Sequence, residues 1–278
     1  MSFRVSSNRF FISALAIGAL TAATNQIASA GTLKLEHSVY LGGLYMGGVR
    51  TAIEEKGSSY EMFSKATTNK SLDWMFKWVA EAQSTGKFDG TSITPSSHYH
   101  RSAWNDKKRG ATLAYKSDGT VKADLVGKKY TDLKKYTPVE PETTKNSLDP
   151  MSMILAAFKK VQSGQGCTGT YPVYDGRRRY DVLLQDVGKK TFKKSRYSVF
   201  SGEASGCRIE MKQIGGFKRK PDYQLPEGSE LVIWSASPVD DGKTVPVRMQ
   251  VLTDLGTMEL HLERYSDGTV SLASKTAD

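Results

Sequence analysis

The chain alternates short segments of strand-forming residues with glycine-containing turns, and it carries a single strong helix signal. Paired glycines stand at residues 42–43 and 47–48, and Asp-Gly pairs stand at residues 89–90 and 175–176. Such pairs between apolar segments favour tight β-turns and hairpins. Successive hairpins predict an antiparallel sheet rather than alternating strand and helix layers.

Alternation of apolar and polar residues is clearest in the last third of the chain. Val247, Met249 and Val251 fall on one face of a predicted strand, and Leu260 and Leu262 do the same in the next. Further strand segments are predicted at residues 33–49 (two strands and a turn), 58–68, 98–104, 112–116, 171–174, 177–185, 191–200, 207–214 and 231–234. Between residues 71 and 86 a short helix through Phe76 gives way to a strand.

The strong helix signal begins at Asp149. Its side chain suits the cap position, and Pro150 suits the first helical position, where a missing amide proton costs nothing. Apolar residues follow at helical spacing and Gly164 ends the run; they are Met151, Ile154, Leu155 and Phe158. This apolar face needs a partner, and a curved sheet is the only large element available. We therefore predict a mainly β fold, in which one antiparallel, strongly curved sheet (an open barrel or β-spiral) wraps around one or two helices.

Residues 1–30 are typical of an export signal. Arg4 and Arg9 precede an apolar run over residues 10–23, and Ala28-Ser29-Ala30 suits a cleavage site after Ala30. An uncleaved membrane anchor is the alternative, but a spanning helix needs about 20 apolar residues. We predict a periplasmic protein in which residues 31–278 form a single mostly β domain. Residues 31–129 are its first half, 130–148 a loop, and 149–278 the helix and second half.

The exported part of the chain is basic. The full chain has 39 Lys and Arg against 29 Asp and Glu, and residues 1–30 contain two arginines and no acid, so residues 31–278 keep a net charge of +8. Export argues against a nucleic-acid partner, and the charge favours anionic envelope surfaces or acidic proteins. Solubility alone is the competing interpretation.

Cys167 and Cys207 are the only cysteines of the chain. In an oxidising compartment, two cysteines predict a structural disulfide. A zinc site would show the Cys-x-x-Cys spacing, which is missing, and a reactive thiol would favour a neighbouring histidine, which neither cysteine has in sequence.

Two groups of residues are candidate ligand contacts. Arg177, Arg178 and Arg179 alternate across a predicted strand, so two share a face; they suit either a shared anion site or a solvated hairpin. Trp74, Phe76 and Trp78 alternate near the start of another strand. Large aromatic residues more often belong to a core, but Trp74 and Trp78 are kept as candidate ligand contacts.

Metal and catalytic signals are weak. His98 and His100 share a strand face, and Glu259, His261 and Glu263 share another. We interpret both groups as solvent-exposed strand positions rather than metal sites. The chain has no Gly-x-Ser-x-Gly elbow, and we assign no catalytic residue, metal or cofactor.

Four short segments carry a resemblance to a known family: residues 40–44 (Tyr-Leu-Gly-Gly-Leu), 149–152, 173–180 and 207–217. With the export signal, they resemble the exported bacterial proteins grouped as domain-of-unknown-function family 3108. The resemblance implies a mostly β periplasmic protein of a Gram-negative cell, with no established catalytic residues. The expected architecture is also similar to that of periplasmic lipoprotein carriers (LolA and LolB), in which an incomplete barrel surrounds a helix.

These observations favour a non-enzymatic periplasmic protein of envelope maintenance, which binds an apolar or lipid-like ligand, a lipoprotein or an envelope protein and makes peripheral membrane contact. The alternative is a hydrolase acting on envelope polysaccharide or lipid, because paired carboxylates cannot be recognised from sequence spacing. An apolar cavity would favour the carrier, and two converging carboxylates in a polar cleft would favour the enzyme. The oligomeric state stays open.

Overall fold

One antiparallel sheet of 14 strands dominates the computed structural model, which describes residues 31–127 and 132–277. The export signal predicted over residues 1–30 lies outside the described residues. A single α-helix, α1 (Pro150–Gln162), occurs in the described part of the chain, with two short 3-10 helices, Lys70–Leu72 and Pro141–Thr144. The predicted mainly β class, the curved sheet and the helix after Asp149 are confirmed.

The strands follow the chain through successive hairpins. In chain order they are β1 (Leu33–Leu41), β2 (Leu44–Lys56), β3 (Ser59–Thr68), β4 (Trp78–Asp89), β5 (Ser92–Trp104), β6 (Lys107–Tyr115), β7 (Val121–Val126), β8 (Gly169–Tyr174), β9 (Arg179–Phe192), β10 (Gly202–Gly215), β11 (Leu231–Ala236), β12 (Val245–Thr253), β13 (Gly256–Ser266) and β14 (Ser271–Ala273). Their order across the sheet is β7-β6-β5-β4-β3-β2-β1-β13-β12-β11-β10-β9-β8, with β14 added to β13. Pairing of β1 with β13 joins the two halves.

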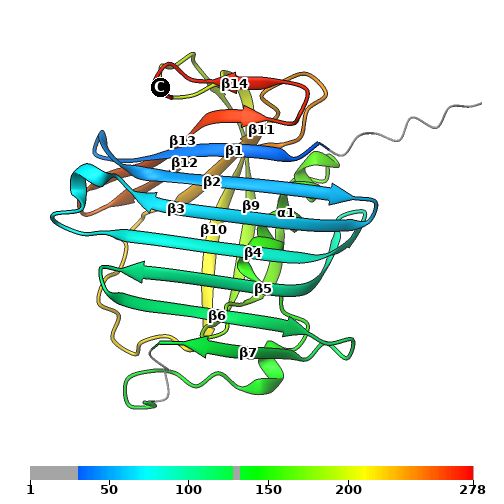
Figure 1. Cartoon of the computed structure of the whole chain (residues 1–278), viewed down its shortest axis with the longest axis vertical. Coiled ribbons are helices and arrows are strands. Elements are labelled where there is room, and N and C mark those ends of the chain that lie inside the picture. Colours follow the sequence, from blue (N-terminus) through cyan, green and yellow to red (C-terminus); the bar gives the residue numbers. More distant parts are fainter. Residues whose placement is uncertain (1–30, 128–131, 278) are drawn as a thin grey trace, which may run out of the picture.

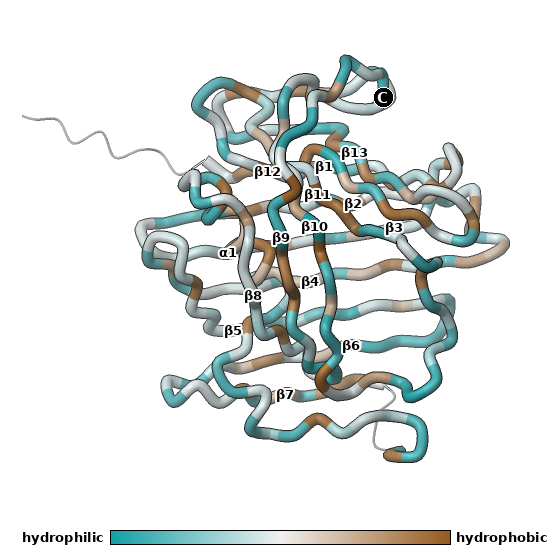
Figure 2. Tube along the Cα trace, turned by 180° about the vertical axis from the view of Figure 1, so that it is seen from behind, coloured by the Kyte–Doolittle hydropathy of each residue, from teal (hydrophilic) through white to brown (hydrophobic). Residues whose placement is uncertain are grey.

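The sheet bends back on itself around the helix. Strands β1 to β7 run across the view in Figure 1, whereas β9 and β10 cross behind them at a steep angle. Seen from behind in Figure 2, β8, β9 and β10 lie in front, and α1 lies between them and strands β1 to β7. The helix therefore occupies the concave side of the sheet, as its apolar face required.

Side-chain contacts, rather than a strand ladder, bring the two free edges together. Gly176, in the turn between β8 and β9, has φ +89°, and a Cβ there would lie 2.6 Å from the Cβ of Ala111 on β6. Beside it, Arg177 Nη2 donates to the Val126 carbonyl on β7 at 2.5 Å. The Asp-Gly hairpin thus packs onto the opposite edge of the same sheet.

The strand predicted over residues 191–200 is wrong. Strand β9 instead runs unbroken to Phe192, where it pairs with Gly202 of β10. The Ser195 and Ser198 hydroxyl oxygens accept hydrogen bonds from the backbone amides of Tyr197 and Phe200, which favours local turns over a ladder. Phe200 is nonetheless buried in the main core cluster.

Candidate functional site

An apolar cavity of about 230 Å³ lies between α1 and the concave face of the sheet. It is larger than the roughly 150 Å³ apolar cavity that suffices to bind benzene. The hollow is partly open to solvent, because several of its lining side chains remain partly exposed. The sheet side is lined by Leu35, His37, Val49, Thr51, Ile53, Met62, Ser64, Leu184, Cys207, Ile209, Ile233, Ser235, Pro246, Met249 and Leu260.

Helix α1 supplies the other wall. Ile154, Phe158 and Val161, at i, i+4 and i+7, line the cavity and remain partly exposed. Leu155 and Ala156, on the neighbouring face, are buried. The predicted apolar face of the helix therefore has two parts: one is buried against the protein, and the other borders the cavity. Met151, Met153 and Ala157 also line the hollow.

Three of the polar side chains on the wall, those of His37, Thr51 and Ser64, lie at hydrogen-bond distance from neighbours. Thr51 and Ser64 lie opposite each other on β2 and β3, with their hydroxyl oxygens 3.3 Å apart. His37 Nε2 lies 2.8 Å from the Pro246 carbonyl oxygen. Burial lowers the pKa of His37 to about 4, partly offset by that bond, so its ring is neutral at pH 7. The cavity consequently has an apolar, uncharged wall.

A buried polar cluster fixes the N-terminal end of α1. The Asp149 carboxylate accepts from the Met151 and Ser152 amides at 3.0 and 2.9 Å, which caps the helix. The same carboxylate accepts from the Ser84 hydroxyl of β4 at 2.6 Å, and His98 Nδ1 of β5 lies 3.2 Å away. Burial raises the pKa of Asp149, but bonding to His98, Ser152 and Ser84 outweighs burial and lowers that pKa below its usual range.

The prediction that His98 and His100 are solvent-exposed is wrong for His98, which is 2% exposed, and His100 is also largely covered. Both point to the face that receives the helix start, and His98 Nε2 lies 3.3 Å from His100 Nδ1. Burial, with the neighbouring His98, lowers the pKa of His100 to about 4. Tyr60 extends the cluster, its hydroxyl 2.7 Å from that of Ser152. The arrangement suits positioning of the helix, because its hydroxyl and imidazole groups are buried and bonded to one another.

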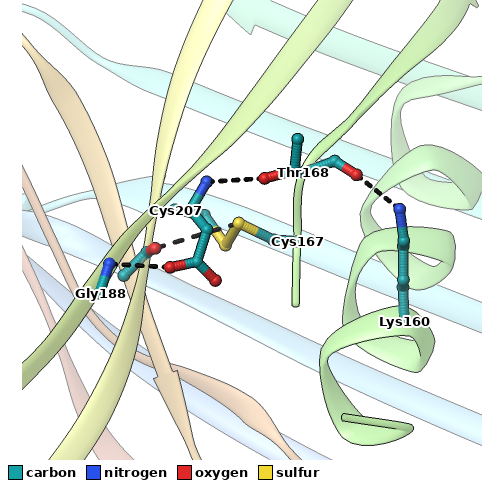
Figure 3. The surroundings of a disulfide bond; sticks show 7 residues. Lys160, Cys167, Thr168, Gly188 and Cys207 are labelled. Carbon is teal, nitrogen blue, oxygen red and sulfur yellow. Dashed lines mark hydrogen bonds between the residues drawn. A yellow bond between two sulfur atoms is a disulfide. The ribbon is translucent and has the colours of Figure 1, made fainter. Parts of the chain in front are cut away.

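The C-terminal end of α1 is tied to the other side of the cavity. Cys167 and Cys207 lie at disulfide distance, with Cα atoms 6.1 Å apart, so the predicted pair is present. Figure 3 shows this bond beside the contact from Lys160 of α1 to the carbonyl of Thr168. The disulfide joins the segment after the helix to β10, and Cys207 itself lines the cavity.

An ion-pair bridge adds a third tie. Lys159 of α1 pairs with Glu55 of β2 at 2.9 Å, and Glu55 also pairs with Lys243 at 3.0 Å. Burial raises the pKa of Glu55, but its bonds to the two lysines lower it overall. The helix is thus attached to β2 and β10, which line the cavity, and to β4 and β5, which hold its N-terminal end.

The arginine run does not reach this cavity. Arg177 and Arg179 are buried, while Arg178 is exposed; the strand predicted from Arg177 begins only at Arg179, so Arg177 and Arg178 belong to the turn. Arg179 donates to the Thr143 carbonyl at 2.6 Å and pairs with Asp181 at 2.7 Å. Arg178 pairs with Asp175 at 2.8 Å. These contacts brace the hairpin, and the anion-binding role of the run stays a prediction.

The predicted core role of the aromatic cluster is wrong for Trp74, which is 82% exposed. Trp74 lies in the connection between β3 and β4, where no element covers it. Trp78 starts β4 and lies opposite Trp104 of β5, and Phe76 stacks on Trp104 with ring centroids 5.5 Å apart. Neither Trp74 nor Trp78 lines the cavity.

The Glu259, His261 and Glu263 face was predicted to be solvated, which is wrong for His261, only 3% exposed. The rings of Tyr40 and Tyr197 cover it at centroid distances of 5.5 and 5.8 Å. Arg248 Nη2 pairs with Glu259 at 2.8 Å, and burial, followed by the Arg248 charge, lowers the pKa of His261 to about 4. Across the described residues, no group of three or more His, Cys, Asp or Glu side chains is placed to hold a metal ion.

A second hollow, of about 520 Å³, is a polar groove on the convex face across β3, β2, β1 and β13. Its carboxylates are engaged: Glu36 pairs with Arg50 at 3.4 Å and Arg264 at 3.7 Å, and Glu263 accepts from Ser38. Of the two hollows, the apolar cavity is the better candidate for a binding site, because the helix that forms one wall is held in place by three sets of contacts.

A family model described as Protein of unknown function (DUF3108) matches residues 36–263. The chain belongs to this family. The match includes the helix, both cysteines and all the residues that line the cavity except Leu35. No curated protein matches the sequence significantly. Within residues 31–127 and 132–277 of this DUF3108 protein, no helix is long and apolar enough to cross a membrane.

The sequence did not single out the cavity. Its lining comes from both halves of the chain, and no local pattern indicates which inward residues leave a void. A partial signal exists on β3, where Ser64 and Ala66 continue the inward register of Met62 with smaller side chains. Short side chains on a concave face leave space that a neighbouring helix fills only in part.

Proposed function

We propose that this protein is an exported envelope protein that holds an apolar or lipid-like group in the cavity beneath α1. The observation that carries the proposal is the cavity itself, about 230 Å³ and lined almost wholly by apolar side chains. Ligand pockets are typically concave, mostly apolar and largely preformed. Support for export comes from the signal-like residues 1–30 and from the disulfide-bonded cysteines.

The polar groups of the site argue for a ligand with an apolar body. His37 is neutral at pH 7, and Thr51 and Ser64 bond to each other, so no side chain on the wall presents a charge to a ligand. A charged group placed there would lose hydration without a partner. An acyl chain or comparable hydrocarbon fits these conditions.

The rigid ties around α1 support the same function. Asp149 fixes the start of the helix and the Cys167–Cys207 bond fixes the segment after its end. Apolar side chains that border a partly open hollow remain accessible to water, so a free helix would bury more apolar surface by moving inward. The ties at both ends of the helix oppose this movement. The fold thus maintains space that unconstrained packing would close.

The test is binding of a fluorescent acyl probe to purified residues 31–278 in solution. Ser64→Phe places a ring in the cavity, and Thr67→Phe places the same ring on the exposed side of the same strand. Wild type and Thr67→Phe should bind the probe, and Ser64→Phe should bind it at least about tenfold more weakly. Equal binding by both variants, or no binding by wild type, would overturn the proposal.

A further inference from the structure

We infer that one end of the sheet is a membrane-contacting surface, which docks on an anionic phospholipid bilayer. The surface comprises large apolar residues at the tips of four neighbouring connections, here called the apolar rim: Leu44, Tyr45, Trp74, Met75, Trp104 and Leu255. It is distinct from the cavity, because none of these residues lines that hollow.

Backbone hydrogen bonds place the four tips side by side. Gly42, in the β1–β2 turn, donates to the Thr257 carbonyl beside the β12–β13 turn at 3.0 Å. Asn69, before η1 (Lys70–Leu72), donates to the Met46 carbonyl of β2 at 2.8 Å. Asn105, in the β5–β6 turn, donates to the Lys77 carbonyl at 2.8 Å. These tips follow one another along the left-hand edge of the sheet in Figure 1.

The rim residues are strongly exposed. Trp74 is 82% and Leu255 79% exposed, and Leu44, Met75 and Trp104 are each more than half exposed. Isolated surface apolar residues are ordinary, but a contiguous group marks an interaction surface. Trp and Tyr in particular favour the boundary between headgroups and acyl chains.

The opposite end of the same strands has a different composition. Its turns β2–β3, β4–β5 and β6–β7 contain residues 57–58, 90–91 and 116–120, and neither these turns nor the flanking strand ends (residues 56–59, 87–92 and 115–121) include an exposed large apolar residue. The β1–β2 and β5–β6 turns at the rim end are Gly42-Gly43 and Asn105-Asp106, so turn formation itself does not require the large apolar residues beside them. The asymmetry therefore needs a cause outside the turns.

Charge beside the rim indicates the partner. The connections at the four tips (residues 42–43, 69–77, 105–109 and 254–255) carry three acids, Asp73, Asp106 and Asp254, against five basic residues, namely Lys70, Lys77, Lys107, Lys108 and Arg109. The β1–β2 tip, residues 41–49, has no charged residue. Basic residues flanking exposed Trp and Leu complement an anionic bilayer, where they gain electrostatic attraction while the apolar side chains enter the interface.

Co-sedimentation with phospholipid vesicles tests this inference. Wild-type residues 31–278 should bind vesicles containing phosphatidylglycerol, bind phosphatidylcholine vesicles weakly, and lose binding as salt rises. Trp74→Ser/Met75→Ser/Leu255→Ser should weaken binding on the order of tenfold or more. Lys107→Gln/Lys108→Gln should weaken it roughly fivefold per lysine at low salt.

Matched controls change similar residues away from the rim. Val270→Ser removes an exposed apolar residue of the β13–β14 turn, and Lys87→Gln/Lys116→Gln removes two exposed charges at the polar end. Both should bind vesicles like wild type. The inference is overturned if wild type ignores phosphatidylglycerol vesicles, or if rim and control variants bind equally. It is also overturned if the rim variant abolishes self-association while vesicle binding is absent.

Acyl-probe binding in solution separates this inference from the proposed function. The rim variants should retain wild-type probe binding, because the cavity lies elsewhere. Loss of vesicle binding with intact probe binding would therefore concern the rim alone, and Ser64→Phe should show the reverse.

Discussion

Ser84 on β4 and Asp149 at the start of α1 are 65 positions apart in sequence and joined inside the protein by a 2.6 Å hydrogen bond. Neither residue is exposed. One carboxylate thereby caps the helix and attaches it to the sheet, and the position of the helix sets one wall of the cavity.

Replacing Asp149 should destabilise the fold strongly. Asp149→Ala removes the helix cap and leaves the buried Ser84 and His98 groups without this partner, so we expect a loss on the order of 3 kcal/mol in unfolding free energy. Asp149→Asn retains an acceptor and should lose less than half as much. Urea unfolding at pH 7 measures both, and equal stability of Asp149→Ala and wild type would contradict this role.

Reducing the disulfide should loosen the C-terminal end of α1. Closure of a loop of 40 residues stabilises a fold by about 2–4 kcal/mol in the chain-entropy account, so reduction should lower the unfolding free energy by that amount. Amide exchange should rise most after residue 160, while the Asp149 end stays protected. In Cys167→Ser/Cys207→Ser, the reductant should have no further effect; a continued response would point to another cause.

Gly176 should tolerate no side chain. Its φ of +89° disfavours other residues, and an added Cβ would press on Ala111 across the sheet opening. Gly176→Ala should lower the unfolding free energy by roughly 1–2 kcal/mol through backbone strain and by about 1–3 kcal/mol more through overpacking. Gly90→Ala is the matched control, with φ +57° and open space, and should show the strain alone. Equal losses in thermal or urea unfolding would exclude the packing contribution.

Stability should fall as pH drops from about 6.5 towards 4. The pKa of His37 is about 4 in the folded protein against 6.5 ordinarily, so in this window the unfolded chain binds a proton that the folded state does not. One proton corresponds to about 1.4 kcal/mol per pH unit. His37→Gln should reduce the slope of unfolding free energy against pH by up to that amount. An unchanged slope would show that folding does not lower the pKa of His37.

Sequence patterns predicted those features that depend on neighbours in the chain. Asp149, Pro150 and Gly164 define the helix locally, and the Asp-Gly pair defines the β8–β9 turn, so both were predictable. The disulfide followed from having two cysteines. Burial of His98 and His261 was not predictable, because the groups that cover them, Asp149 and Tyr197, come from distant segments.

The cavity and the apolar rim were also not predictable from sequence, because each is formed by segments that are distant in the chain. A void is the space left between side chains from β1, β2, β3, β9 to β13 and α1, and no segment contains it. Trp74 was expected in the core because aromatic residues usually are, but its connection lies beyond the edge of the sheet. Sequence shows that Trp74 is large and apolar, and only the fold shows which way it faces.

Native mass spectrometry of the protein isolated after export, without delipidation, tests the central claim most directly. The proposal predicts that wild type and Thr67→Phe carry a bound acyl-containing molecule, lost on denaturation, and that Ser64→Phe carries far less of it. Wild-type protein of bare polypeptide mass that also fails to take up added acyl probe would contradict the cavity's assigned role.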